Sequence, residues 1–261
     1  MNDLVLRELH SIEEFEDVFR LFDRIWHPPP GGAPVTVEMM RALSHAGNYV
    51  AGAYRSDHLV GASVGFLSAP VGRAMHSHVT GAVTGAAAGS GNGFALKLHQ
   101  REWALARGLE MITWTFDPLI RRNAHFNLAK LGARPEEYLP AFYGQLDDAV
   151  NAGDESDRLL VVWRLCEPRV LAAVRREPYR TEIPPDAVVG IADTGGRPVA
   201  GRTDAATVLV AVPRDIESLR TEDPEAARAW RLAVRDVLGG LMGEGARVTG
   251  FRDGGYVVER A

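Results

Sequence analysis

Residues 75–132 read MHSHVTGAVTGAAAGSGNGFALKLHQREWALARGLEMITWTFDPLIRRNAHFNLAKLG. In order, this stretch predicts a strand, a glycine-rich turn, an amphipathic helix, a second strand and a second helix. The turn contains Gly85, Gly89, Gly91 and Gly93, and the helix is expected to start on the last of them. A glycine turn before a helix leaves backbone N–H groups at the positive end of the helix dipole, which suits a phosphate. The alternative interpretation is a flexible loop before an ordinary surface helix.

The helix after the turn is predicted to have an apolar and a polar arc. Helical spacing puts four residues on the apolar arc, namely Phe94, Ala95, Leu98 and Leu105. The opposite arc holds Lys97, Gln100 and Arg107. The N-terminal segment gives a similar pattern, since Ser11 and Glu14 form a capping box before a long apolar stripe that is expected to pack on a sheet.

The glycine turn matches neither of the common nucleotide-binding motifs. A dinucleotide fold would need an acidic residue about 20 residues on, and a P-loop would end in Gly-Lys-Ser/Thr. The turn resembles the pyrophosphate loop of the GNAT superfamily of acyl-CoA N-acyltransferases, whose pattern is Gln/Arg-x-x-Gly-x-Gly/Ala. That register gives Ala88, Gly91 and Gly93 here. Residues 123–132 resemble the fourth helix of that fold, and the resemblance covers roughly residues 4–165.

Three shorter segments resemble a subgroup within this superfamily. They are QREWALARG, ITWTFDPL and the late AWRLAVR. The subgroup consists of predicted acetyltransferases with a C-terminal extension, and some of its members are associated with N-acylation of amino acids.

Two positions depart from the pattern of the superfamily. Ala88 stands where Gln or Arg is usual, and a lost charge-assisted hydrogen bond to phosphate costs about 1.5–3 kcal/mol. Leu128 stands where many members place a Tyr as the acid for the departing thiolate. Backbone N–H groups are therefore expected to hold the pyrophosphate, and the acid is not assigned.

The resemblance implies an α/β (α+β) fold, with a mixed, mostly antiparallel sheet flanked by helices. The expected domains are an acyltransferase domain, 1–166, and a C-terminal extension, 167–261. The extension is predicted to have a β-α-β-β order. It begins with a Pro/Gly-rich linker or irregular arm at 179–202. A strand follows at 207–212, then a helix with Asp223 as cap, then a closing hairpin over 248–259.

The expected reaction is acyl transfer from an acyl-CoA thioester, with acetyl-CoA as the first choice, to a primary amine. The amine is a small molecule, such as an amino acid, and attacks directly in a ternary complex. An α-amine with a pKa of about 8 needs little help from a base at neutral pH. Backbone N–H groups around residues 79–83 would polarise the carbonyl. The predicted cosubstrate contacts are Val79, Gly81, Val83, Gly89, Gly91, Asn92, Gly93 and Asn123.

His78 and Asp117 are the candidate catalytic residues. Strand alternation puts His76, His78 and Thr80 on one face and Ser77, Val79 and Gly81 on the other. His78 is either a base or a solvent-facing histidine. Asp117 precedes Pro118, so its carboxylate either caps a turn or serves as a base or amine ligand.

Three residues are candidates for binding the acceptor. Trp26 ends the first helix, in a region that lines the acceptor pocket of the resembling fold; the alternative is a half-buried aromatic at a helix end. Arg231 and Arg235 lie one helical turn apart and could hold a substrate carboxylate. The alternative for both arginines is a solvated face paired with acidic neighbours. The acidic loop at 147–157 is expected to be a solvated connection.

Composition excludes several classes of function. The net charge of −5 gives no nucleic-acid footprint. The one cysteine, Cys166, excludes an intramolecular disulfide and a Cys-rich zinc site, and no metal is expected. The N-terminal residues form neither a signal peptide nor a membrane span. A cytoplasmic location is therefore expected, and a homodimer is left open.

Two other functions are compatible with the same resemblance. One is a degenerate domain that binds a ligand or partner without catalysis. The other is an enzyme that decarboxylates an acyl thioester. Coenzyme binding tests the first, and a product assay with malonyl- and acetyl-thioesters tests the second.

Overall fold

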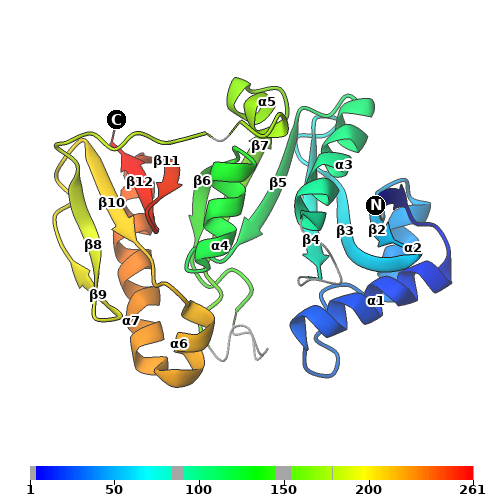
Figure 1. The fold of residues 1–261 in the computed structure, drawn as a ribbon, viewed down its shortest axis with the longest axis horizontal. Helices are drawn as coiled ribbons and strands as arrows, with labels where there is room; N and C mark the ends of the chain where they lie inside the picture. Colours follow the sequence, from blue (N-terminus) through cyan, green and yellow to red (C-terminus); the bar gives the residue numbers. More distant parts are fainter. Residues whose placement is uncertain (1–3, 84–90, 145–153, 178, 261) are drawn as a thin grey trace. The chain divides into compact units, whose positions relative to one another are not determined.

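A computed structural model describes residues 4–83, 91–144, 154–177 and 179–260 (Figure 1). The chain groups into two compact units, Met1–Trp114 and Thr115–Ala261. Each unit is considered by itself below. The division into residues 1–166 and 167–261 places the boundary elsewhere in the chain and stays a prediction.

The first unit begins with strand β1 (Val5–Glu8) and helix α1 (Ile12–Trp26). The predicted capping box is confirmed: Ser11 Oγ accepts from the Glu14 N–H at 3.3 Å, and the Glu14 carboxylate accepts from the Ser11 N–H at 3.0 Å. Helix α2 (Val37–His45) follows and is capped by Thr36. The apolar stripe of α1 is buried against strand β3, in a core that includes Phe15, Val18, Leu21, Phe22, Met40, Val50 and Val64.

The sheet of the first unit has the strand order β1-β2-β3-β4-β5. Its other strands are β2 (Tyr49–Arg55), β3 (His58–Ser68), β4 (Ala74–Ala82) and β5 (Met111–Phe116), the last of which continues into the second unit. The β1–β2, β2–β3 and β3–β4 pairs are antiparallel, and β4–β5 is parallel. Helix α3 (Asn92–Ala106) supplies the connection into β5.

Helix α3 buries its polar arc, which differs from the simplest expectation of an amphipathic helix. Lys97 and Gln100 are 4% and 0% exposed, whereas Phe94, Ala95 and Leu98 are only partly buried. The buried face faces β2, β3 and β4. Lys97 donates to the hydroxyl of Ser77 on β4, and Gln100 donates to the hydroxyl of Ser63 on β3. These hydrogen bonds allow the two polar side chains to be buried.

The second unit contains helix α4 (Arg121–Ala124), the π-helical turn η1 (His125–Lys130), the antiparallel pair β6 (Arg134–Leu139) and β7 (Arg158–Arg164), and helix α5 (Pro168–Val174). Its five-stranded sheet has the order β11-β12-β10-β8-β9. The strands are β8 (Val188–Thr194), β9 (Arg197–Ala200), β10 (Thr207–Ala211), β11 (Arg247–Arg252) and β12 (Gly255–Glu259). The helices between β10 and β11 are α6 (Ile216–Glu222), α7 (Pro224–Val234), the π-helical turn η2 (Arg235–Gly239) and α8 (Gly240–Gly243).

The mixed, mostly antiparallel α/β architecture is confirmed. The β-α-β-β order predicted for the C-terminal extension is present as β10, the helices between β10 and β11, β11 and β12. The prediction of an irregular arm at 179–202 is wrong, because the second half of this segment forms the β8–β9 hairpin. The Thr194–Arg197 pair is joined by Gly195 and Gly196, both with positive φ. Two glycines with positive φ give the tight turn that a twisted hairpin prefers.

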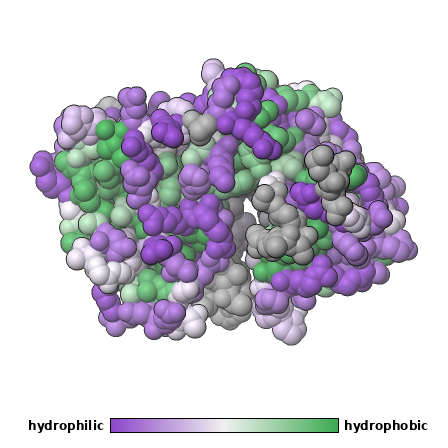
Figure 2. Space-filling model, in the orientation of Figure 1, coloured by the Kyte–Doolittle hydropathy of each residue, from purple (hydrophilic) through white to green (hydrophobic). Residues whose placement is uncertain are grey.

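On the face drawn in Figure 2, hydrophobic residues form patches that are interrupted by hydrophilic ones. Within the part of the chain that the structure describes, no helix combines the length and the apolar character that crossing a membrane requires.

Candidate functional site

The start of helix α3 is the first feature that can bind a ligand. Gly91 is the N-cap, with φ of 83°, and no side chain caps the helix. A Cβ added at Gly91 or Gly93 meets no described residue within 4 Å, so the described part of the chain leaves the backbone here approachable. The predicted contacts Gly91, Asn92 and Gly93 therefore come together at one helix end. Gly89 and Ala88 lie outside the described residues.

A positive charge lies beside this helix start. Arg55, the last residue of β2, donates from Nε and Nη2 to Asn92 Oδ1 at 3.4 and 3.2 Å. The sequence shows no basic residue in the glycine turn, and nothing in the local pattern connects Arg55 with α3. The fold brings this guanidinium to the end of the helix where an anion is favoured.

Strands β4 and β5 part within the sheet of the first unit. They pair from Ala74↔Met111 to His76↔Thr113, while β4 continues to Ala82. Beyond His76 the edge of β4 away from β3 is therefore unpaired among the described residues. Buried backbone N–H and C=O groups require partners, so this gap, called the fork below, can bind an extended ligand.

The register of β4 decides which N–H groups face the fork. The Val83 N–H donates to Val60 O at 2.9 Å, so it points toward β3. Because the direction alternates along an antiparallel ladder, the N–H groups of Val79 and Gly81 also point toward β3. Those of Thr80 and Ala82 point to the fork. The predicted donors Val79 and Gly81 lie on β4 and Val83 follows its last residue, but the N–H groups that point to the fork are those of Thr80 and Ala82.

A β-bulge changes the faces of β4. The register with β3 shifts between Val64↔Val79 and Gly65↔Ser77, so His78 is the extra residue. His78 is exposed, and its Nε2 lies 2.9 Å from Pro34 O. The expected grouping of His76, His78 and Thr80 on one face is wrong, because after the bulge Thr80 shares the face of Ser77. A simple period of two gives no sign of the bulge.

His76 lies at the last paired position of the fork. Its Nδ1 lies 3.0 Å from Thr113 Oγ1, and its ring packs against Phe66. Burial, with smaller effects from His78 and Lys97, lowers the pKa of His76 to about 4. His76 is therefore neutral at physiological pH.

A buried lysine reaches into the fork from α3. Lys97 Nζ donates to Ser77 Oγ at 2.8 Å and to Gln100 Oε1 at 3.1 Å. It also lies 4.0 Å from the centre of the Trp114 ring. Gln100 in turn donates to Ser63 Oγ at 3.2 Å. Burial lowers the pKa of Lys97 to about 7.

Lys97 is the functional candidate that sequence reasoning missed. Helical periodicity placed it on the polar arc, which is normally solvated. The available signal was the set of small hydroxyl residues, Ser63, Ser77 and Thr80, on two strands that neighbour each other in the chain.

Gly81 is required for the close approach of α1 to β4. A Cβ at Gly81 would lie 2.6 Å from Trp26 Cη2 and 3.0 Å from Ile25 Cδ1. Trp26 is partly buried and packs against Phe22, with ring centroids 5.0 Å apart. This packing fits a structural aromatic at the helix end and places Trp26 against the strand of the fork.

We therefore expect Gly81→Val to lower the free energy of unfolding by about 1–3 kcal/mol, because it overpacks this contact. Urea unfolding measures the change. Combining Gly81→Val with Trp26→Leu should recover part of the loss, since Leu leaves room for the added methyl groups. An equal loss in the single and double variants would contradict this account of the contact.

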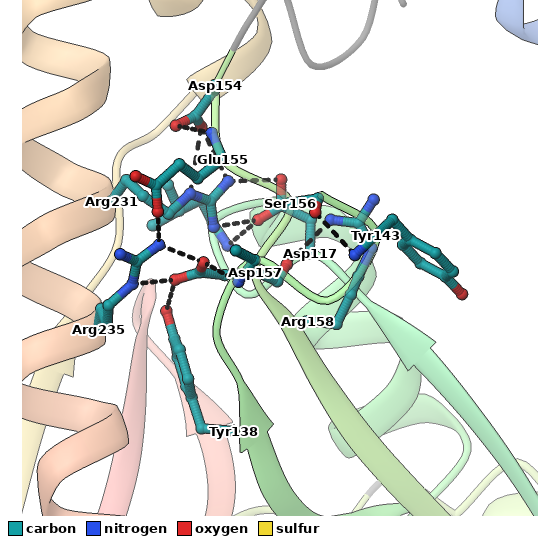
Figure 3. A network of polar contacts seen from close by, with 12 residues as sticks. Asp117, Tyr138, Tyr143, Asp154, Glu155, Ser156, Asp157, Arg158, Arg231 and Arg235 are labelled. Atoms are coloured by element: carbon teal, nitrogen blue, oxygen red, sulfur yellow. Dashed lines mark hydrogen bonds and ion pairs between the residues drawn. The ribbon is translucent and has the colours of Figure 1, made fainter. Parts of the chain in front are cut away.

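In the second unit, Asp117 belongs to a buried ionic cluster (Figure 3). Arg231 donates from Nη1 and Nη2 to the two Asp117 oxygens at 2.9 and 3.0 Å, and from Nη2 to Asp154 at 2.9 Å. Arg220 Nη2 donates to Asp117 at 2.6 Å and to Asp154 at 3.0 Å. These four side chains, called the ionic cluster below, are each at most 7% exposed.

The ionic cluster argues against the expected roles of Asp117 and Arg231. Burial alone would raise the pKa of Asp117, but Arg231 and Arg220 hold it well below its ordinary range. A general base works best with a pKa near the operating pH, so a carboxylate held by two guanidinium groups is a poor one. Arg231, whose pKa is raised by Asp117 and Asp154 despite its burial, is likewise engaged inside the protein.

Arg235 is bonded to a second set of acidic residues (Figure 3). Its Nε donates to Asp157 Oδ2 at 2.9 Å, and its Nη2 also pairs with Glu155. Tyr138 Oη donates to Asp157 Oδ2 at 2.6 Å. The expectation of a solvated loop at 147–157 is therefore wrong for Asp154, Ser156 and Asp157, which bind arginines or backbone groups from buried positions. Residues 147–153 lie outside the described residues.

The remaining predicted positions lie in α4 and η1. Asn123 is partly buried, and its N–H donates to Ile120 O at 2.9 Å. Leu128 is buried and supplies no polar group. A nearby pocket of about 390 Å³ is lined by Arg121, Arg122 and Arg214 together with Asp215 and Glu217, and Arg122 pairs with Glu217. Among the residues that the structure describes, no group of three or more His, Cys, Asp or Glu side chains is arranged to hold a metal ion.

Comparison with known proteins identifies the fold. No family model matches the chain, and no curated protein matches it. A solved structure from Desulfovibrio desulfuricans, assigned to the GNAT family of acetyltransferases, matches with a TM-score of 0.52 and 16% identity, covering 63% of this chain and all of that one.

Two further solved structures agree with this match. A Salmonella typhimurium protein assigned as an acetyltransferase, solved with its cofactor acetyl-CoA, gives a TM-score of 0.50 at 14% identity, over 64% of this chain and 96% of that one. The ribosomal-protein-S18-alanine N-acetyltransferase of Escherichia coli gives a TM-score of 0.50 at 10% identity, over 63% and 96%. This chain therefore has the fold of the GNAT acetyltransferases. At such identities the likeness shows the fold alone.

Proposed function

We propose that this protein is an N-acyltransferase that moves an acyl group from an acyl-CoA thioester to a primary amine. The observation that carries the proposal is the fork between β4 and β5, next to the uncapped start of α3, in a GNAT fold. Acetyl-CoA is the first donor to test, since one structural neighbour was solved with it. The acceptor is a small-molecule amine, and an amino acid is the class to test first.

The described residues fit an extended phosphorylated thioester. The first N–H groups of α3, with the Arg55 guanidinium beside them, favour a pyrophosphate. The N–H groups of Thr80 and Ala82 face the fork and can donate to a carbonyl oxygen there. When bound, the cosubstrate supplies an activated acyl carbon, and the protein supplies orientation and hydrogen-bond donors.

Gly93→Val tests the helix start. Gly93 has open space around its Cβ position and no positive φ, so the free protein should tolerate the side chain. We expect the affinity for acetyl-CoA to fall by about tenfold or more, because the side chain displaces the phosphate from the N–H groups. Titration calorimetry measures this. Gly240→Val is the matched control, as a helical glycine of the second unit that is equally open.

The activity itself is tested by thiol release from acetyl-CoA with a panel of amino acids and polyamines, and product mass identifies the acylated amine. Binding without thiol release would favour a ligand-binding protein. Release of carbon dioxide from malonyl-CoA would favour a decarboxylase. Unchanged acetyl-CoA affinity in Gly93→Val would overturn the assigned pyrophosphate site.

A further inference from the structure

Lys97 lies at the point where the two strands of the fork part. Ser77 follows His76 on β4 and Trp114 follows Thr113 on β5, so both come directly after the last pair of the two strands, His76↔Thr113. Lys97 Nζ contacts both, at 2.8 Å from Ser77 Oγ and 4.0 Å from the Trp114 ring centre. The lysine thus marks the closed end of the gap in which the proposed thioester lies.

The distance from the helix start suits this position. Lys97 lies five positions after Asn92, which advances about 7.5 Å along α3, and the lysine side chain extends farther. A ligand held by its phosphates at the start of α3 and running down the fork brings its far end toward Lys97.

The choice of lysine at this position is chemically informative. Only two of the 29 basic residues in the sequence are lysines, Lys97 and Lys130. An arginine keeps its proton under all ordinary conditions, whereas a buried lysine exchanges its proton near neutral pH. Burial lowers the pKa of Lys97 to about 7, which lies in the range that acid–base catalysis requires.

Among the residues that the structure describes, the groups around Lys97 do not offset its burial with a negative charge. From β4, His76 is the titratable neighbour, and its imidazole is neutral. From β3 the neighbouring group is the hydroxyl of Ser63, bonded through Gln100. From β2, Arg55 lies at the start of α3 and Tyr49 bonds His99, while from β1 Glu8 bonds Trp103 at the other end of the helix.

We propose that Lys97 is the acid–base residue of the acyl transfer, passing a proton to the departing sulfur and regaining one from the attacking amine. This inference rests on the proposed function. The position usually given to an acid, Leu128, holds no proton to donate.

The step balances in atoms and charge. The amine nitrogen forms a bond to the acyl carbon and the carbon–sulfur bond breaks, leaving the electron pair on sulfur. The Lys97 ammonium donates its proton to that sulfur and becomes a neutral amine. The nitrogen of the new amide sheds its surplus proton, which returns to Lys97. Ser77 and Gln100 hold Nζ in place through both transfers.

The test begins with the free protein. Labelling lysine with ¹³C at the ε-carbon gives two signals, and Lys130→Met assigns them. The Lys97 signal should titrate near pH 7. A Lys97 signal that shows no titration between about pH 6 and 8 would overturn the inference before any substrate is added.

The second arm uses acetyl-CoA and the best amine of the panel. We expect Lys97→Met to lower kcat by about 10²–10⁴, with KM for acetyl-CoA within about twofold. Lys97→Arg keeps the charge but not the proton transfer, so it should also lose kcat. The positive charge of Lys97→Arg should lower the pKa of the thiol of bound CoA, so the absorbance of the thiolate should appear at a lower pH in Lys97→Arg than in Lys97→Met. A purely structural lysine would not separate these two variants.

The outcomes separate this inference from the proposed function. If Lys97→Met has the turnover and the pH profile of the wild type, the proposed role of Lys97 is overturned and the acyltransferase function stays in place. Failure of the wild type to bind or turn over acetyl-CoA overturns the proposed function, and the inference with it.

Discussion

Asp117→Asn is expected to lower the free energy of unfolding by about 3–5 kcal/mol, because it removes one charge from a buried cluster and leaves two guanidinium groups short of a partner. Urea unfolding at pH 7 measures the loss. Asp204→Asn is the matched control: Asp204 also binds an arginine in a bidentate manner, but the pair is exposed. We expect no measurable change there.

The same cluster sets a pH dependence. The pKa of Asp117 is lower in the folded protein than in the unfolded chain, so the stabilisation is complete above about pH 4 and is lost as the pH falls below it. Wild-type stability should therefore fall more steeply in acid than that of Asp117→Asn. If Asp117→Asn unfolds at the wild-type urea midpoint at pH 7, the cluster contributes nothing to the fold.

Lys97→Met is expected to stabilise the protein. It replaces a buried ammonium with an apolar side chain of similar length, which should raise the free energy of unfolding by about 1–3 kcal/mol at pH 6. Part of the gain is offset because Ser77 Oγ and Gln100 Oε1 each lose a partner. When a residue serves catalysis at a cost in stability, its substitution is expected to give a variant that is more stable but inactive.

The gain from Lys97→Met should depend on pH with a definite sign. The folded-state pKa of Lys97 is about 7, below the value of the unfolded chain. Well below pH 7 both states carry the proton and the cost of burial is complete. Between about pH 7 and 10 the folded state has lost its proton, so wild-type stability rises toward that of the variant.

Urea unfolding at pH 6, 8 and 10 tests this trend, and Lys130→Met is the control, since Lys130 is exposed. A destabilised Lys97→Met at pH 6 would mean that the hydrogen bonds outweigh the cost of burial.

Local sequence signals predicted much of the fold because they depend on neighbours in the chain. The capping box at Ser11 and Glu14, the closing hairpin of β11 and β12 and the glycine-capped helix all rest on residues within a few positions of each other. The superfamily resemblance added the mixed, mostly antiparallel sheet, which such signals do not contain.

The site was harder to predict because its contacts are long-range. Asp117 and Arg231 are 114 positions apart, and no local pattern indicates that they pair. Helical periodicity separated Phe94 and Leu98 from Lys97 and Gln100, but it did not show that the latter two are buried, which depends on hydroxyls of β3 and β4. Sequence spacing likewise could not show that Arg55 lies beside Asn92.

The single extra residue in β4 also sets how this strand responds to insertions and deletions. Deleting His78 would restore regular pairing with β3 and leave Ser77 and Thr80 two positions apart, where they still share one face. Lys97 would keep Ser77 as its partner, and the contact between Ser63 and Thr80 would also remain. An extra residue inserted into a regular part of the strand would, by contrast, reverse the faces of all residues on one side of it unless it formed a second bulge.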